Sequence, residues 1–177
     1  AQATSGKVSV REVSGDATLQ CVSDSVIAEN IKGRLTVTAI SADVSVRNVQ
    51  EGVRVNSVSG TITITNTKGL IEARTTNGDI NVREVESRDV QLNTHSGTMT
   101  YDGSIFDNGR YTFESFNGGM LILIPANANF TVTASTFSGS LETDFPITIP
   151  PGTTQTNRPK RLQGTHGNGG AQIKASG

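Results

Sequence analysis

Three arginines recur at equal intervals in the first half of the chain, and their chemistry suits an acidic ligand. Arg11, Arg47 and Arg83 are each followed by Glu or Asn and then by Val. Guanidinium groups bind carboxylates in a planar, bidentate manner. A row of them predicts contact with an acidic polymer such as a uronic-acid glycan. The alternative is a charge ladder in which Glu29, midway between the first two arginines, bridges them, with each exposed pair contributing less than about 1 kcal/mol.

A second basic cluster lies late in the chain, in the segment PITIPPGTTQTNRPKRLQ at 146–163. Its cations are Arg158, Lys160 and Arg161, and its four prolines break the pattern of the preceding residues. Such a segment predicts an excursion over the surface. We expect this basic loop to be a further contact for a partner, against the alternative that its charges are only solvated.

Residues for nucleophilic or metal-assisted chemistry are few and dispersed. No spacing pairs His95 with His166, or either of them with the single cysteine, Cys21. Triad and zinc patterns are therefore missing from the sequence. The calcium-binding nine-residue repeat needs a regular aspartate, whereas the aspartates here are irregularly placed. We expect no metal, no cofactor and no catalytic residue, and hence a protein that is not an enzyme.

A nine-residue repeat positions these side chains, and it runs nine times without a gap from Ser5 to Val85. The units read SGKVSVREV, SGDATLQCV, SDSVIAENI, KGRLTVTAI, SADVSVRNV, QEGVRVNSV, SGTITITNT, KGLIEARTT and NGDINVREV. Positions four and six of each unit are aliphatic, position five is polar in eight of the nine, and position nine is Val, Ile or Thr. A fixed short period predicts a repeat architecture.

Each unit has the pattern of a short strand followed by a corner. Apolar residues two apart, with a polar residue between them, share one face of an extended strand. The Gly, Asp, Asn, Ser or Lys that opens the next unit is typical of a turn. A strand this short cannot bury its face alone, so the units must stack. An antiparallel meander is the alternative, but the constant nine-residue offset favours a parallel β-solenoid.

The true period is eighteen residues, because position eight alternates between two kinds of side chain. It is Glu or Asn in the odd units and Cys, Ala, Ser or Thr in the even ones. Two strands per eighteen-residue coil explain this alternation, whereas a three-strand coil of twenty-seven residues would scramble it and ranks second. Asn30, Asn48 and Asn66 then stack at one corner about 4.8 Å apart. Their amides can donate and accept along the column as a structural ladder.

The later chain keeps the pattern with insertions. We predict one domain over 1–177, with regular coils over 5–103, irregular wider coils over 104–146, a surface loop over 147–163 and a closing strand over 164–177. About eight coils would result. All eight aromatic residues lie between Tyr101 and Phe145. We expect them to fill the wider coils to native packing density, against the alternative of ligand stacking.

Composition bounds the class of protein and its partners. The formal net charge is −1 and lysine and arginine are scattered, so no nucleic-acid footprint is expected. No run of apolar residues approaches the roughly eighteen of a membrane span. The abundance of Ser, Thr, Asn and Gly favours an extracytoplasmic location, in the periplasm, at the cell surface or secreted. The opening Ala1-Gln2-Ala3 suits a chain from which a signal peptide has been removed.

The units SGDATL, SGTITI, NGDINV and SGTMTY, with the late return GTHGNGGAQIKASG, resemble the bacterial adhesin-like family of β-helix domains. The resemblance covers nearly the whole chain and implies an exported or envelope-associated protein with no catalytic residues to transfer. It implies a non-enzymatic module that binds a glycan or a surface protein along a rigid rod. A structural spacer that self-associates end to end is one alternative. A polysaccharide-degrading enzyme is the other, although the acidic residues are too dispersed for a carboxylate pair.

Overall fold

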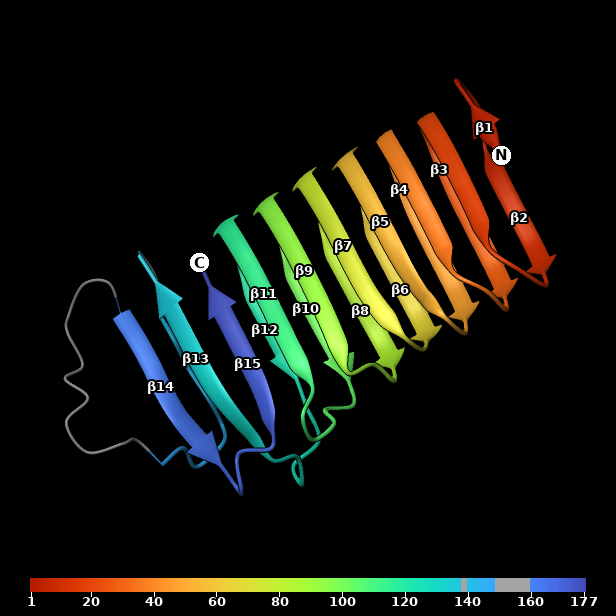
Figure 1. Ribbon diagram of the computed structural model, residues 1–177. Helices are drawn as coiled ribbons and strands as arrows, with labels where there is room; N and C mark the ends of the chain where they lie inside the picture. The colour runs from red at the N-terminus through yellow and green to blue at the C-terminus, as the bar shows by residue number, and fades with distance from the viewer. Residues whose placement is uncertain (138–139, 149–159) are drawn as a thin grey trace.

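The computed structural model describes residues 1–137, 140–148 and 160–177, and every regular element in these ranges is a β-strand. The predicted fold is confirmed: parallel strands stack into a β-solenoid of about seven turns with eighteen-residue spacing (Figure 1). No helix in the described ranges is long and apolar enough to cross a membrane. The repeat therefore encodes a rod with a strand on each of two faces.

The strands of the regular part follow the repeat units. They are β1 Gln2–Ala3, β2 Val8–Val13, β3 Ala17–Ile31, β4 Leu35–Val49, β5 Gly52–Ser59, β6 Ile62–Thr67, β7 Leu70–Asn77, β8 Ile80–Val85, β9 Asp89–Ser96 and β10 Met99–Gly103. The later strands are β11 Arg110–Asn117, β12 Met120–Leu123, β13 Phe130–Thr136, β14 Lys160–His166 and β15 Ala171–Ser176.

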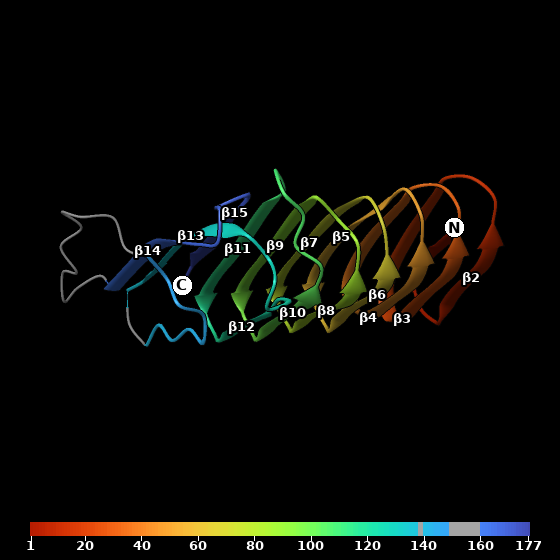
Figure 2. The same ribbon diagram turned by 90° about the horizontal axis from the view of Figure 1, so that it is seen from below.

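The strands form two faces that we call face A and face B. Face A contains β1, the first parts of β3 and β4, and then β5, β7, β9, β11, β15, β13 and β14. Face B contains β2, the later parts of β3 and β4, and then β6, β8, β10 and β12. Figure 2 shows the two layers with the chain passing between them at two edges. Both layers keep register over most of their length, as where Val26 pairs with Val8 on one side and with Val44 on the other. The pairing of β10 with β8 shifts in register between Asp102 and Gly103.

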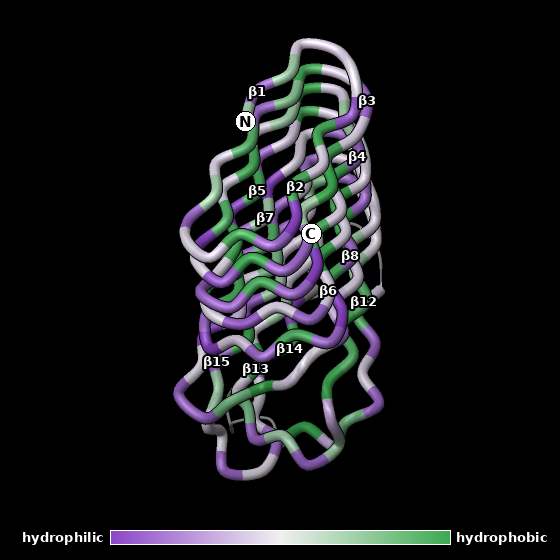
Figure 3. The backbone as a smooth tube through the Cα atoms, turned by 90° about the vertical axis from the view of Figure 1, so that its right-hand side faces the viewer, coloured by the Kyte–Doolittle hydropathy of each residue, from purple (hydrophilic) through white to green (hydrophobic). Residues whose placement is uncertain are grey.

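The core lies between the faces and is built from positions four and six. Pairs such as Val44 and Val46, or Ile62 and Ile64, are fully buried, while the intervening polar residues point outward. The alternation of hydrophobic and hydrophilic residues therefore repeats from coil to coil (Figure 3). This arrangement satisfies the backbone of each strand through its neighbours while its apolar side chains leave water.

The C-terminal end departs from stacking in chain order. The last strand, β15, lies between β11 and β13, and β14 pairs antiparallel with β13 (Figure 1). After β12 the chain turns at Pro125, whose carbonyl accepts from the Ala128 amide at 3.0 Å, and β13 forms one strand position further along the rod. Ala171, Ile173 and Ala175 then bury their side chains in the position beside β11. Face A extends three strands beyond β12, which is why about seven full turns form instead of eight.

Both ends of the range predicted as a surface loop, 147–163, contain paired residues. Strand β14 begins at Lys160, within the range 147–163, and Thr148 pairs antiparallel with Thr165 in an isolated bridge. Residues 149–159 lie outside the described ranges. Strand β14 pairs with β13 but cannot be recognised from hydrophobic periodicity. Its central residues include Gln163 and Gly164, which interrupt any alternation of aliphatic residues.

The aromatic residues fill the wider coils only in part. Tyr101, Tyr111 and Phe113 are fully buried, and the Tyr101 ring contacts those of Phe113 and Tyr111 with centroids 5.3 and 6.2 Å away. Phe116 and Phe137, by contrast, are 72% and 84% exposed. For these two residues the prediction of core packing is wrong, and the reason lies in the geometry of the edge on which they stand.

Candidate functional site: an exposed apolar edge

The backbone at position eight distinguishes the two edges of the rod. In the odd units this residue has φ between 50° and 57°. The left-handed conformation breaks the in-and-out alternation, so the next side chain, at position nine, turns into the core. Asn tolerates this conformation better than most residues. The residues concerned are Glu12, Asn30, Asn48, Asn66 and Glu84.

A ladder of side-chain hydrogen bonds runs along this edge, which we call the Asn edge. The amide of Asn30 donates to the Glu12 carboxylate at 2.7 Å, that of Asn48 to Asn30 Oδ1 at 2.8 Å, and that of Asn66 to Asn48 Oδ1 at 2.7 Å. Each donor lies eighteen residues after its acceptor. The predicted asparagine column thus lies in register, and its donor direction is the same in every coil.

At the opposite edge of the rod, side chains continue to alternate between core and solvent. Positions eight and nine therefore point in the opposite directions to those on the Asn edge. Position eight points inward where the two faces converge, and only small side chains fit. They are Cys21, Ala39, Ser57 and Thr75, followed in the later coils by Thr94 and Ser115. Cys21 donates its thiol to the Ser23 carbonyl at 3.2 Å, which fits a small corner residue. Position nine consequently points into solvent.

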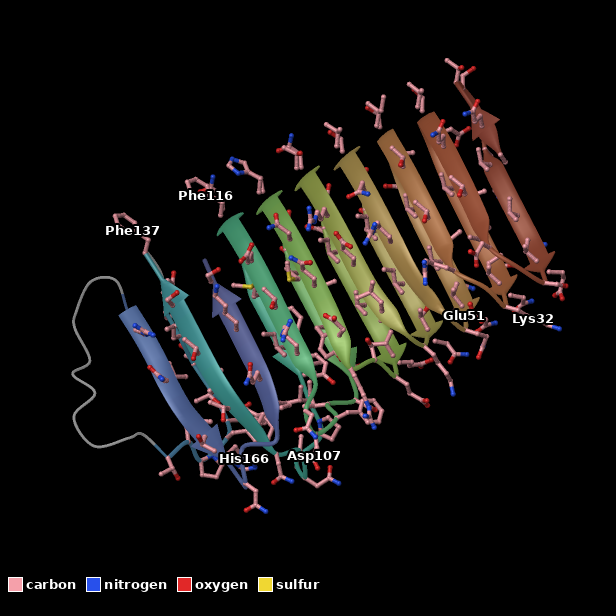
Figure 4. The ribbon with its side chains drawn as sticks, viewed as in Figure 1. Lys32, Glu51, Asp107, Phe116, Phe137 and His166 are labelled. Carbon is pink, nitrogen blue, oxygen red and sulfur yellow. The ribbon has the colours of Figure 1, made fainter. Side chains whose placement is uncertain are left out.

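The outward side chains of position nine form a row that we call the apolar edge. It consists of Val22, Ile40, Val58, Thr76, His95, Phe116 and Phe137. Figure 4 shows Phe116 and Phe137 standing off the upper margin of the rod, in line with the side chains of the preceding coils. The His95 and Phe116 rings stack at 4.9 Å between centroids with 6° between planes. Val22, Ile40 and Val58 are 38%, 47% and 47% exposed.

The columns beside the apolar edge are polar and almost uncharged. On the face B side they are Ser23, Ser41, Ser59, Asn77, Ser96 and Asn117. On the face A side they are Gln20, Thr38, Asn56, Arg74, Asn93, Glu114, Ser176 and Ser135, followed on β14 by Arg161. An apolar ridge with polar margins is typical of a protein contact surface.

The arginines singled out in the sequence share one column on face B. Arg11, Glu29, Arg47, Thr65 and Arg83 are in register, and Arg11 Nε lies 3.0 Å from Glu29 Oε2. Because Glu29 and Thr65 separate the arginines, the column alternates and is no continuous cationic stripe. Its role in binding an acidic polymer stays a prediction.

The other predicted basic contact is only partly placed. Arg158 lies outside the described residues, and Lys160 opens β14. Arg161 is exposed on the same strand and pairs in register with Ser135 of β13. This contact also stays a prediction.

A shallow pocket lies at the C-terminal end of the Asn edge, with a volume of about 510 Å³. Its lining includes Asn66, Glu84, Glu86 and Asp102, together with Ser104 and residues at the ends of β10 and β12. Lys68 Nζ already contacts Glu86 at 2.9 Å. Within the described ranges no cluster of three His, Cys, Asp or Glu side chains is arranged to hold a metal ion. The pocket therefore offers three carboxylates together with the Asn66 amide and Ser104 as hydrogen-bonding groups.

Burial shifts two titratable groups in the core. Burial raises the pKa of the Tyr101 and Tyr111 hydroxyls, so both stay protonated at neutral pH. Tyr101 donates to the Ser104 carbonyl at 3.1 Å, and Tyr111 donates to the Ser87 carbonyl at 2.7 Å. The Tyr111 hydroxyl also accepts from the Phe106 amide at 2.9 Å. The Tyr101–Ser104 and Phe106–Tyr111 bonds fix the loop over 104–109 against the wider coils, which is a structural role.

The sequence contained a signal for the apolar edge that pattern matching on aliphatic positions missed. Positions eight and nine cannot both point inward on an unbroken strand. The small residue at position eight of the even units therefore indicates that the aliphatic residue after it points out. The same rule places His95 at position nine of its unit, in register with Thr76 and Phe116.

The comparison with protein families gives one result for this chain. The model described as Toastrack DUF4097 matches residues 1–177. Neither the curated proteins nor the solved structures contain a match. The described residues form a β-solenoid, the matching family model extends over residues 1–177, and its description names no activity.

Proposed function

This chain belongs to the Toastrack DUF4097 family, and from that premise we propose that it is a non-enzymatic module of the cell envelope or cell surface. Its task is to bind a protein partner along the apolar edge of a rigid rod. The observation that carries the proposal is the apolar edge itself, a row of exposed side chains made mostly of Val, Ile, His and Phe. Affinity would come from many small contacts along the rod instead of one pocket.

The rigidity of the rod supports this function. Its core side chains are buried, and its strands are paired coil to coil. Ladders such as Asn30 to Asn48, and ion pairs such as Arg54 with Glu72 at 2.8 Å, tie neighbouring coils together at the surface. A preorganised row of side chains loses little conformational entropy when a partner binds.

The end-to-end spacer is the weaker alternative. Seamless stacking would continue both sheets from one copy into the next. Face A extends three strands beyond β12, so the edge of β12 is set back from the end of the rod. A second copy could pair with β14 or with β12, but flush stacking onto both at once is geometrically blocked.

A binding assay with released-product detection tests the proposal. The immobilised domain is incubated with envelope proteins and with polysaccharides from cells that produce it, before and after protease treatment. We expect protease-sensitive binding that is lost in the triple variant Ile40→Ser, Val58→Ser, Phe116→Ser. The control Thr38→Ser, Asn56→Ser, in the neighbouring column, should bind like the wild type.

Other outcomes of the same assay contradict the proposal. Protease-resistant binding that is lost in Arg11→Ala, Arg47→Ala, Arg83→Ala would assign the contact to a glycan on face B. Release of reducing or unsaturated ends would identify an enzyme. If the triple edge variant bound as strongly as the wild type, the apolar edge would not be the binding surface.

A further inference from the structure

Two opposite charges beside the apolar edge lie at equal distances from one coil. In the flanking column on face A, Arg74 lies one coil before Asn93 and Glu114 lies one coil after it. From Gln20 to Ser135 the other members of this column are uncharged, and Arg161 of β14, in register with Ser135, extends it by one strand. All members of the column on the face B side are uncharged. Two opposite charges at equal distances from a central coil are the pattern required by a two-fold axis.

We propose that the apolar edge is occupied by the apolar edge of a second copy of this chain, in an antiparallel pair with its two-fold axis at the coil of His95. The inference rests on the proposed function, because it names the partner of the same surface. In this pair Arg74 of each copy faces Glu114 of the other copy. Face A of both copies then lies on the same side.

The side chains of the edge match under the same operation. Counted in strand positions, Thr76 and Phe116 lie one step on either side of His95, and Ile40 and Phe137 lie three steps on either side. An antiparallel pair therefore places each phenylalanine opposite a smaller side chain. A parallel pair would stack Phe116 on Phe116 and set Arg74 against the uncharged Ser and Asn column, so it gains no ion pair.

The dimensions of the edge predict a modest affinity. Seven strand positions at about 4.8 Å give a contact about 30 Å long, and a ridge one side chain wide buries an area at the small end of protein interfaces. We expect dimerisation with a Kd in the micromolar range. In the single chain Arg74 contacts Glu72 at 3.0 Å, and the Glu114 carboxylate accepts from the Asn93 amide at 2.9 Å. These contacts keep both charged side chains on the outer surface of face A.

Sedimentation over a range of concentrations tests the charge pairs. Arg74→Glu and Glu114→Arg should each weaken dimerisation at least tenfold, and the double variant should restore it. The off-edge control Arg54→Glu makes the same charge change on face A and should leave the Kd unchanged. Weakening by both single variants without recovery in the double variant would overturn the pairing of these two residues.

Disulfide trapping tests the orientation in a Cys21→Ala background. His95→Cys should cross-link to itself, because it lies on the axis, and Thr76→Cys should cross-link to Phe116→Cys in a mixture. Val22→Cys should not cross-link to itself. Self-cross-linking at Val22→Cys would indicate a parallel pair and overturn the proposal.

The failure of this inference is separable from that of the proposed function. A wild-type domain that is monomeric at all concentrations overturns the self-pairing. If the triple edge variant nevertheless loses the protease-sensitive binding, the apolar edge still has a protein partner, of a different kind. If the edge variant keeps that binding, both proposals are wrong.

Discussion

The two edges of the rod carry the same residue types at position nine and expose them oppositely. Ile31, on the Asn edge, is 0% exposed, whereas Ile40, nine residues later on the apolar edge, is 47% exposed. Val49 and Val58 repeat the contrast one coil further. The difference arises from the residue before each one, because only the Asn edge places a left-handed residue at position eight. One backbone conformation thus decides whether an aliphatic side chain serves the core or a partner.

The contrast also separates the energetic roles of the edges. The Asn edge needs no partner, because its amides donate along the ladder and its aliphatic residues are buried. The apolar edge leaves its aliphatic and aromatic residues in water, at a free-energy cost that association would recover. A side chain exposed in coil after coil is a regular feature of the repeat and differs from scattered surface hydrophobic residues, which need no explanation.

The largest expected effect comes from truncating the same residue type on the two edges. Ile31→Ala removes fully buried methyl groups and leaves a cavity, so we expect a loss of about 2–5 kcal/mol in the free energy of unfolding. Ile40→Ala removes exposed groups and should cost less than about 1 kcal/mol. Urea unfolding of both variants measures the difference. Equal losses would contradict the assignment of the edges.

A second comparison concerns the turn that follows each edge. Gly97, after the apolar edge, has a φ of 141°, and a Cβ there would collide with the Gly78 carbonyl of the preceding coil. We expect Gly97→Ala to cost about 2–3 kcal/mol through strain and lost coil contact. Gly15, in a turn after the Asn edge, has open space around it, so Gly15→Ala is the matched control. A thermal unfolding scan should separate the two variants by several degrees.

Breaking the ladder of the Asn edge should have a smaller effect. Asn48 both donates to Asn30 and accepts from Asn66. Asn48→Ala removes both bonds and strains the left-handed backbone, so we expect a loss of about 1–2 kcal/mol. Asn48→Gly keeps the backbone conformation and removes only the bonds, so it should recover part of the loss. If the glycine variant were no more stable than the alanine variant, the left-handed backbone would carry none of the effect.

Most of the fold was predictable because every coil repeats the same pattern of apolar and polar positions. The spacing of Val44 and Val46 specifies a strand, and the alternation at position eight specifies two strands per coil. The position of β15 between β11 and β13 was not predictable. It depends on the turn at Pro125, which places β13 one strand position further along the rod, and the periodicity of the sequence does not show where a strand will pair. The chain also gives no local sign that β14 runs antiparallel.

The candidate site was predictable only in its parts. The sequence gives charge and spacing directly, so Arg11, Arg47 and Arg83 drew attention as a column. Whether Val58 or Phe116 faces the core or water depends on the conformation of the preceding residue, and a hydrophobic pattern treats both outcomes alike. The symmetric placement of Arg74 and Glu114 became visible only once strand register had aligned residues whose sequence spacing is uneven because of insertions.

The smallest expected effect is a gain in stability, at the C-terminal end of the Asn edge. Every amide of the ladder donates toward the N-terminus, and Asn66 lies in register with Glu84, whose carboxylate can only accept. Glu84→Asn supplies a donor and a residue better suited to a φ of 53°. We expect a gain of about 0.5–1 kcal/mol in urea unfolding. The control Glu12→Asn, at the other end, gains the same backbone preference but replaces the charged acceptor of Asn30, so its net change should be smaller. An equal gain at both ends would show that backbone preference alone, and not the direction of the ladder, separates the two edges.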